Sequence, residues 1–528
     1  MSDTGGNLIE RLLSPDAYPH AVEIPIRVAE THISWVLLTG PYAYKIKKPV
    51  RLSFLDYSSL ELRRTCCEEE LRLNRRYAPD LYLAVAAIAG PASAPRVDGA
   101  AQPIEYAVRM RQFDQRQELD ALVASDAVGV REIAALGSHI ARFHAGARPV
   151  DPATPFGRPD AVHRFTTANF AELRRLPEAQ RWTARLQDLE RRVTSTFDEH
   201  RDFIAARRSD DRVRECHGDL HCGNVVRWSG ELTPFDGIEF DPALRFIDVA
   251  NDLAFLTMDL SERGRDDLRH AALQAWAAAL GDFAAVRVLP YFEAYRALVR
   301  AKVAALRALQ LDAGSAERER DVSHAARYLD WAAGRARRGK AGLMLTCGYS
   351  GSGKTWLAEA VARELHALHV RSDVERKRLA GLGPLDDSRS PPDAGIYTRD
   401  YTVRTYGRLR ECAADVMRGG ENVVVDAAYL RRDERERMLA LARELGLPAV
   451  VLHCTAPMNV MRDRVARRAA SRTDASEAGV ATLERQVDYW EPFAASEAAH
   501  VLDVDTSAPD AVAACVAELR RRGFRPTS

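Results

Sequence analysis

The chain has 528 residues, more than one hydrophobic core usually supports, so two or more folding units are expected. Hydrophobic residues make up 46% of the sequence and charged residues 28%, a balance that is typical of globular proteins and excludes a disordered chain. Basic and acidic residues number 75 each, so net charge leaves a nucleic-acid partner possible but does not favour one. We recognise no leader-like segment and no run of about 18 apolar residues, and we predict a cytoplasmic protein without a membrane partner.

Lysine is rare in this chain. Seven lysines stand among the 75 basic residues, and Lys45, Lys47 and Lys48 lie close together. Arginine can replace lysine at most exposed positions, but not where a compact and flexible ammonium is required. We therefore expect this cluster, like Lys354, to be functional rather than a solvated turn.

Short apolar runs with strand-like alternation dominate the first 110 residues. Strands are predicted at 22–28, 32–38, 43–47, 81–89 and 105–110, and a helix is predicted at 58–77. Lys45 and Lys47 alternate within the third run and so share one face of it. Further helices are predicted at 118–147 and 167–207. The first half is therefore predicted to be an antiparallel sheet with one inserted helix, followed by a helical region.

A polar motif with chemical meaning follows these helices. Asp219 and Asn224 lie five residues apart in a predicted loop, and Asp236 comes shortly afterwards. We predict that Asp219 accepts the proton of an attacking hydroxyl, while Asn224 and Asp236 supply oxygen ligands to Mg²⁺ bound to a triphosphate. The HGD triplet alone is a weak signal, but the three residues together indicate a phosphotransferase.

The sequence HGDLHCGN at 217–224, with Asp236 after it, resembles the aminoglycoside phosphotransferase and choline kinase group, which has a bilobal, protein-kinase-like fold. The resemblance covers about residues 20–330 and also implies that residues 106–110 contact adenine. A glycine-rich GxGxxG loop is missing, since residues 29–42 contain only Gly40.

The same resemblance implies roles for two charged residues of the first half. Lys45 is expected to hold the α- and β-phosphates, and Glu70 is expected to hold Lys45 in place. Lys47 is the alternative for the first role and Glu69 for the second.

A short basic segment bounded by glycines, residues 335–340, is predicted to connect two domains. The predicted domains are therefore 1–334 and 341–528.

The second domain opens with the strongest motif of the chain. GYSGSGKT at 348–355 follows the apolar run 343–345 and fits the P-loop pattern GxxxxGK[ST] in full. Backbone N–H groups of such a loop surround phosphate oxygens, its lysine reaches the β- and γ-phosphates, and its hydroxyl faces Mg²⁺. The residues predicted to bind the nucleotide are Gly348, Ser350, Gly351, Ser352, Gly353, Lys354 and Thr355.

Strands alternating with helices after the P-loop predict a parallel sheet that binds ligands at the carboxyl ends of its strands. These strands are predicted at 367–370, 422–425, 449–453 and 500–504. Asp373 follows the first of them and is predicted to meet the acceptor hydroxyl, with Glu375 as the alternative. Asp426 follows the second and is a predicted Mg²⁺ ligand. Arg464 and Arg468, on a predicted helix at 459–470, are expected to stabilise charge on the transferring phosphoryl group.

Residues 341–510 resemble the zeta-toxin, gluconate-kinase and polynucleotide-kinase group of P-loop phosphotransferases. The order of the halves resembles a bacterial family of bifunctional aminoglycoside phosphotransferase/ATP-binding proteins. The predicted fold class is thus α+β for the protein-kinase-like domain and α/β for the P-loop domain.

These resemblances imply an enzyme that uses ATP and Mg²⁺. Each half is expected to transfer a γ-phosphoryl group to a hydroxyl of a small molecule. Two alternatives remain open: a binding protein in which one half senses nucleotide and gates the other, and a nucleic-acid end kinase in the second half.

Overall fold

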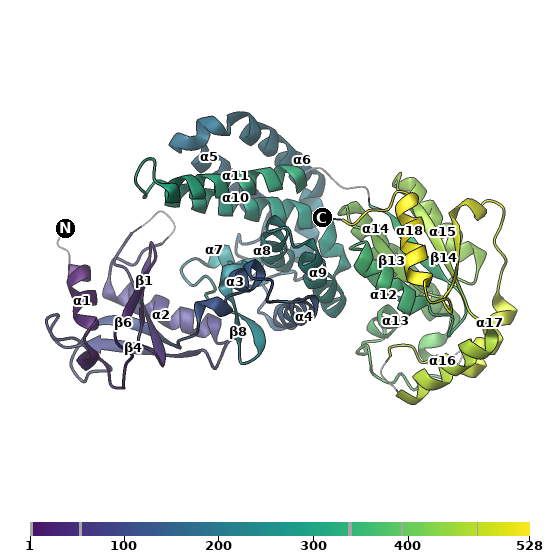
Figure 1. The fold of residues 1–528 in the computed structure, drawn as a ribbon, viewed down its shortest axis with the longest axis horizontal. Helices are drawn as coiled ribbons and strands as arrows, with labels where there is room; N and C mark the ends of the chain where they lie inside the picture. Colours follow the sequence, from purple (N-terminus) through teal and green to yellow (C-terminus); the bar gives the residue numbers. More distant parts are fainter. Residues whose placement is uncertain (1–3, 52–54, 336–340, 392–393, 472–473, 528) are drawn as a thin grey trace. The chain divides into compact units, whose positions relative to one another are not determined.

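The computed structural model describes residues 4–51, 55–335, 341–391, 394–471 and 474–527 (Figure 1). All of the predicted connector except Arg335 lies outside these residues. Within them, no helix combines the length and the apolar character that a membrane span requires.

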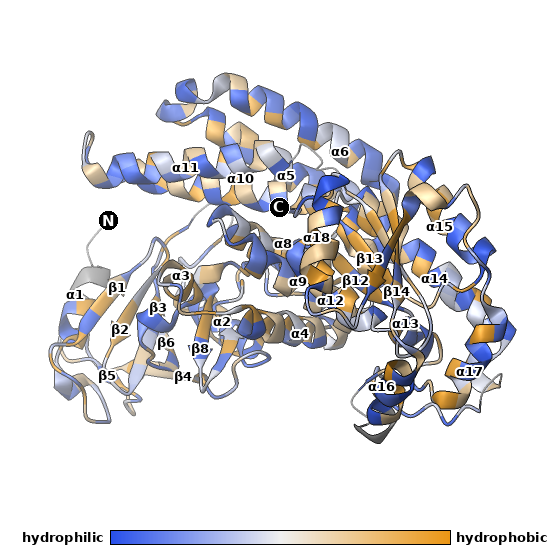
Figure 2. Cartoon of the chain, turned by 45° about the vertical axis from the view of Figure 1, so that its right-hand side comes forward, coloured by the Kyte–Doolittle hydropathy of each residue, from blue (hydrophilic) through white to orange (hydrophobic). Residues whose placement is uncertain are grey.

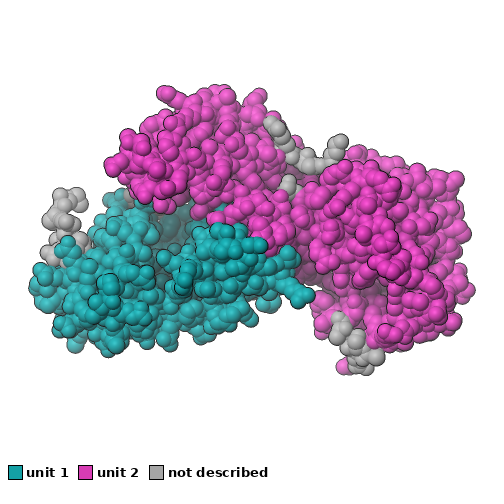
Figure 3. Space-filling view, in the orientation of Figure 1, with its two compact units in different colours: residues 1–165, 201–259 teal, residues 166–200, 260–528 magenta. Residues whose placement is uncertain are grey.

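The chain forms two compact units, coloured separately in Figure 3. The first contains residues 1–165 and 201–259, and the second contains residues 166–200 and 260–528. The helices between 260 and 335 thus belong to the same unit as the P-loop, whereas the division into domains at 335–340 stays a prediction.

An antiparallel sheet of six strands is the framework of the first unit. Its strands are β1 (Arg27–Glu30), β2 (Ser34–Leu38), β3 (Tyr42–Lys47), β4 (Tyr82–Ala89), β5 (Arg96–Val97) and β6 (Pro103–Arg111), in the order β1-β2-β3-β6-β4-β5. Helix α2 (Leu60–Asn74) begins after Ser59, whose hydroxyl accepts the backbone N–H of Leu62. Cys67 of α2 is buried together with Val108 and Met110 of β6, which fixes the helix against the sheet.

One sequence prediction fails in this sheet. Residues 106–110 were expected to contact adenine, but they lie inside β6, which pairs with β3 on one side and β4 on the other. Residues 107–110 therefore belong to two ladders and Tyr106 to the ladder with β4, so the segment is the interior of a strand and not a free connection that could receive a base. The connection to the following helices begins only after Arg111.

The rest of the first unit is mainly helical. Its elements are α1 (Thr4–Leu12), α3 (Leu119–Ala124), α4 (Val130–Gly146), β7 (Val213–Glu215), β8 (Val225–Trp228), β9 (Glu231–Pro234), α7 (Pro242–Arg245) and β10 (Phe246–Asp248). Helices α5 (Pro159–Arg174), α6 (Thr183–Ser209) and α8 (Val249–Glu262) have residues in both units. The loop between β7 and β8 carries Asp219 and Asn224, and Asp236 follows β9.

The second unit joins helices to a parallel sheet. The helices before the sheet are α9 (Asp266–Leu280), α10 (Leu289–Ala308) and α11 (Ala316–Arg335). The strands are β11 (Leu343–Cys347), β12 (Leu368–Arg371), β13 (Val423–Asp426), β14 (Ala449–Thr455) and β15 (Val501–Asp505), in the order β12-β13-β11-β14-β15. All pairs are parallel, and the strand residues are strongly apolar, as the orange of β12, β13 and β14 in Figure 2 shows.

Helices connect these strands as the sequence predicts. They are α12 (Lys354–Glu364), α13 (Ser372–Leu379), α14 (Arg399–Arg418), α15 (Arg432–Glu444), α16 (Met458–Ser471), α17 (Val480–Tyr489) and α18 (Ala511–Arg521). Leu357 and Val361 of α12 pack on Met344, Val424 and Leu452 of the sheet. The predicted fold class, a protein-kinase-like fold followed by a P-loop parallel-sheet fold, is confirmed.

Candidate active sites

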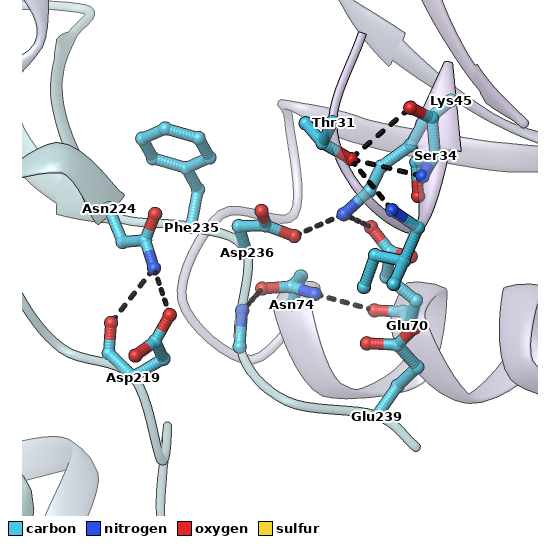
Figure 4. Close-up of polar contacts among 12 residues, drawn as sticks. Thr31, Ser34, Lys45, Glu70, Asn74, Asp219, Asn224, Phe235, Asp236 and Glu239 are labelled. Atoms are coloured by element: carbon cyan, nitrogen blue, oxygen red, sulfur yellow. Dashed lines mark hydrogen bonds and ion pairs between the residues drawn. The ribbon is translucent and has the colours of Figure 1, made fainter. Parts of the chain in front are cut away.

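Two lysines of β3 converge on one buried carboxylate in the first unit, and Figure 4 shows the contacts that Lys45 makes there. Lys45 Nζ lies 2.9 Å from Glu70 Oε1 and also contacts Asp236. Lys47 Nζ lies 2.7 Å from Glu70 Oε2 and also contacts Glu239. Glu70 is wholly buried, so its two oxygens are each satisfied by one ammonium group.

The surroundings set the charges of this cluster. Burial by itself raises the pKa of Glu70, but Lys45 and Lys47 outweigh it and lower that pKa to about 2. Burial likewise acts to lower the pKa of both lysines, yet the carboxylates beside them hold it well above the usual value. Glu70 and the two lysines are therefore ionised at neutral pH.

Exposure separates the two lysines. Lys47 is 1% exposed and is enclosed by Glu239 and by Tyr57, whose hydroxyl donates to Glu239. Lys45 is 12% exposed, and its partner Asp236 is 39% exposed. Lys45, not Lys47, is thus the lysine that reaches the open side of the cluster. The sequence did not single out Tyr57 or Glu239, since neither belongs to a motif, although Glu239 follows Asp236 by three residues.

The loop after β7 joins the other two predicted residues. Asn224 Nδ2 donates to the backbone oxygen of Asp219 at 2.9 Å and to its Oδ2 at 3.0 Å (Figure 4). His221, which the sequence analysis did not assign, accepts the N–H of Gly223 on Nδ1 at 3.1 Å, and its Nε2 lies 3.5 Å from Asp219 Oδ2. Because Nδ1 accepts this N–H, Nε2 is the ring nitrogen that can donate toward Asp219.

A buried aspartate anchors this loop. Asp252 accepts the backbone N–H groups of His217 at 3.1 Å and Gly218 at 2.8 Å. Gly218 has a φ of 89°, and a Cβ there would lie 2.8 Å from the carbonyl oxygen of Leu244, so only glycine fits. Burial opposes ionisation of Asp252, but its hydrogen bonds, the one to His144 foremost, lower its pKa to about 2.

Asp236 is held in an unusual backbone conformation, with a φ of 63°. Its N–H donates to the Tyr82 hydroxyl at 3.0 Å, and the N–H of Gly237 donates to Asn74 Oδ1 at 2.8 Å. A left-handed backbone at a residue other than glycine persists only where the surroundings enforce it. These two bonds direct the Asp236 carboxylate toward Lys45.

The P-loop of the second unit has the shape that a phosphate requires. Gly351 has a φ of 80°, and a Cβ there would lie 2.4 Å from the carbonyl oxygen of Met461. Ser352 is buried, and its Oγ has no hydrogen-bond partner among the described residues. A glycine backbone in this conformation and a hydroxyl without a described partner, both at the start of a helix, suit the binding of a phosphate group.

Side chains occupy parts of this loop. Lys354 Nζ donates to the carbonyl oxygen of Tyr349 at 2.7 Å, and burial lowers its pKa. The N–H of Ser350 donates to Gln486 Oε1 of α17 at 2.7 Å. A triphosphate on this loop would replace both contacts.

Asp426 ends β13 beside the P-loop, as predicted. Thr346 Oγ1 lies 3.3 Å from Asp426 Oδ1, and His369 Nε2 lies 3.3 Å from Asp426 Oδ2. Burial raises the pKa of Asp426, but the hydrogen bonds of His369 and Thr355 and the charge of Lys354 lower it to about 2. Asp426 is therefore an ionised carboxylate in contact with Thr355, which suits a shared cation.

The two carboxylates considered for the acceptor lie in different surroundings. Asp373 lines a cavity beside the P-loop, and α13 has no side-chain cap, so Asp373 does not act as one. Glu375 is 1% exposed and lies 3.1 Å from both Arg378 Nε and Arg408 Nε. Glu375 is thus tied into ion pairs.

The two predicted arginines of α16 both line the cavity. Arg464 donates to the carbonyl oxygen of Gly351 at 3.3 Å and to Thr506 Oγ1 at 2.9 Å. Arg468 donates to the carbonyl oxygen of Ala478 at 2.9 Å. The acceptors in these three hydrogen bonds are neutral oxygen atoms.

The cavity has a volume of about 840 Å³, near the upper end of the range for small-molecule sites. It is bounded by the P-loop, Asp373 and Asp426, and by the first turns of α14 and α15. Except for Gly348 and Ser352, the site residues predicted separately along the second half of the sequence thus line one space.

A domain family and a mycobacterial relative both match this chain. The AAA domain family matches residues 343–493. The uncharacterized protein Rv2004c of Mycobacterium tuberculosis is 32% identical over 475 residues, which cover 90% of this chain and 93% of that protein. The chain belongs to the family of this mycobacterial protein. Because the match covers nearly the whole length of both proteins, the family shares the order of the two halves.

Solved structures resemble each half separately. A gluconokinase from Sinorhizobium meliloti 1021 has a TM-score of 0.26 at 24% identity and covers 35% of this chain and 95% of its own. A choline/ethanolamine kinase family protein from Mesorhizobium loti has a TM-score of 0.37 at 12% identity and covers 63% of this chain and 99% of its own.

Proposed function

We propose that the chain is an ATP-dependent phosphotransferase with two sites, each of which transfers a γ-phosphoryl group to a hydroxyl of a small molecule. One observation carries the proposal: each unit gathers a lysine, oxygen ligands suited to Mg²⁺ and a further carboxylate. A protein that only senses nucleotide has no need of that carboxylate in both units.

In the first site, Lys45 holds the phosphates and Glu70 fixes Lys45, as their contact at 2.9 Å supports. Asn224 and Asp236 hold Mg²⁺, which neutralises charge on the phosphates when bound. Asp219 takes the proton of the acceptor hydroxyl, with Asn224 and His221 orienting its Oδ2.

In the second site, the P-loop and Lys354 hold the triphosphate, and Thr355 and Asp426 hold its metal. Asp373 takes the acceptor proton while the hydroxyl oxygen bonds to the γ-phosphorus and ADP departs. Arg464 and Arg468 stabilise the charge of the transferring group.

A nucleotide titration of the full chain tests the proposal. We expect two binding events with AMP-PNP and Mg²⁺, one lost in Lys45→Met and the other in Lys354→Ala. ADP release must also rise when an acceptor is added. Two binding events without ADP release under any acceptor would favour the nucleotide-gated alternative, and a response confined to oligonucleotides would favour a nucleic-acid end kinase.

A further inference from the structure

The cavity of the second unit is strongly cationic. Eight lysine or arginine side chains line it, against four aspartate or glutamate side chains. A triphosphate with its Mg²⁺ carries about two negative charges net, so it balances only part of the excess. Positive charge is left over for a second ligand.

Neighbours outside the lining cancel only part of the excess, since Arg371 lies 2.9 Å from Asp474. Arg376 is 8% exposed and donates to neutral groups, the Ile396 carbonyl oxygen at 2.8 Å and Thr402 Oγ1 at 3.3 Å. Arg399 and Arg431 are exposed and form no ion pair among the described residues. By contrast, Arg437 lies 3.4 Å from Asp433 and so is partly neutralised.

The positions of Arg399 and Arg431 are electrostatically unfavourable. Arg399 is the first residue of α14, and Arg431 is the N-cap of α15. The amino end of a helix repels a cation and attracts an anion. Both arginines line the cavity from these ends, so an anion placed between them would relieve the repulsion.

One carboxylate that lines the cavity neutralises little of this excess positive charge. Glu434, next to the start of α15, lines the cavity, and burial followed by the charge of Asp433 raises its pKa to about 7. It is therefore largely protonated below neutral pH.

We propose that the acceptor of the second site carries a carboxylate or a phosphate in addition to its reacting hydroxyl, and that Arg376, Arg399 and Arg431 bind this anionic group. The inference rests on the proposed function of the same site. Asp373 lies on α13 with Arg376, so the reacting hydroxyl and the anionic group are held by neighbouring side chains.

Three sugars that differ only at one carbon test the inference: glucose, glucuronate and glucose 6-phosphate. They are titrated into the full chain loaded with Mg²⁺ and AMP-PNP, and they are assayed for ADP release in an Asp219→Asn background. Glucuronate or glucose 6-phosphate is expected to bind at least about ten-fold more tightly than glucose. Comparing the affinities of glucuronate and glucose 6-phosphate also shows whether the site prefers a carboxylate or a phosphate.

Arg399→Gln and Arg431→Gln should each weaken binding of the preferred anion about ten-fold and leave AMP-PNP affinity unchanged. Arg410→Gln is the matched control, because Arg410 also lies on α14 but pairs with Glu444 outside the cavity lining. Equal or tighter binding of glucose, or equal losses in the control, would overturn the inference. Turnover with glucose alone would do so while leaving the proposed function intact, whereas anion binding without any AMP-PNP binding would refute the proposed function instead.

Discussion

At the scale of single residues, the two lysines of β3 have different roles in the first site. One faces a ligand, and the other supports the cluster. Alternation along β3 predicts that Lys45 and Lys47 share a face, and both do reach Glu70. Alternation cannot tell which one faces a ligand, because this depends on Tyr57 and Glu239, which are distant in sequence. Because Tyr57 and Glu239 enclose Lys47, this lysine supports the cluster and does not face a ligand.

Lys45→Met and Lys47→Met should therefore have different effects. Lys45→Met is expected to abolish nucleotide binding at the first site with little loss of stability, because Glu70 keeps Lys47. Lys47→Met leaves Glu70 with one partner and Glu239 buried without its ammonium, a loss of about 3–5 kcal/mol. Thermal unfolding and AMP-PNP titration of both variants check this, and equal destabilisation by the two would contradict it.

Glu434 gives a dependence on pH. Its pKa is raised from 4.5 to about 7, so the folded state binds the proton more tightly than the unfolded state. Its contribution to stability is therefore present at low pH and is lost as pH rises toward 7. Glu434→Gln should raise the unfolding temperature by a few degrees at pH 8 but not at pH 5. Glu411→Gln, at an exposed position, serves as the control, and a gain for Glu434→Gln that is the same at both pH values would rule the account out.

At the scale of elements, α17 competes with the nucleotide. Its Gln486 accepts the N–H of Ser350, one of the P-loop donors that a phosphate oxygen requires. Binding of a triphosphate therefore has to displace this side chain. The contact lies between segments 136 residues apart, so no local pattern could predict it.

Gln486→Ala should tighten binding of the triphosphate at the second site, because the competing hydrogen bond is lost. A neutral bond of this kind contributes about 0.5–1.5 kcal/mol, so a gain of about two- to ten-fold is expected. Titration with AMP-PNP measures it, with Glu484→Gln on the exposed side of α17 as the control. Weaker binding in Gln486→Ala would mean that Gln486 holds the phosphate instead.

Most elements could be predicted from the sequence because their signals are local. The P-loop motif and the apolar runs of the parallel sheet each fix a segment independently of the rest. Strand ends likewise place Asp373 and Asp426 at one edge. The adenine contact assigned to residues 106–110 failed because the position of β6 between β3 and β4 depends on pairing over long distances.

At the scale of the whole molecule, buried ion pairs hold α9 and α11 against the P-loop part of the second unit. Arg269 of α9 lies 3.0 Å from Glu293 and 2.7 Å from Glu421, and Arg335 of α11 lies 2.7 Å from Glu421. All four side chains are at most 8% exposed. Gln274 of α9 also accepts the backbone N–H of His369, whose ring contacts the Asp426 carboxylate. Helices before residue 335 thus support the second site.

Arg269→Met should destabilise the second unit by about 3–5 kcal/mol, since it removes a buried cation from two buried carboxylates. Arg320→Met is the control, because its ion pair with Glu317 is exposed and contributes at most about 1 kcal/mol. Limited proteolysis and thermal unfolding compare the two, and equal stability would show that the buried cluster does not hold the unit together. A fragment starting at residue 341 lacks Arg269 and Arg335, so the full chain is the proper material for assays.

The most direct test of two catalytic sites is ADP release by the full chain and by Asp219→Asn, Lys354→Ala and the double variant, measured with a panel of uncharged and anionic hydroxyl acceptors. We predict that Asp219→Asn loses release with one set of acceptors, that Lys354→Ala loses it with another, and that the double variant releases none. Full release by the double variant, or loss of all release in both single variants, would contradict two independent phosphotransferase sites.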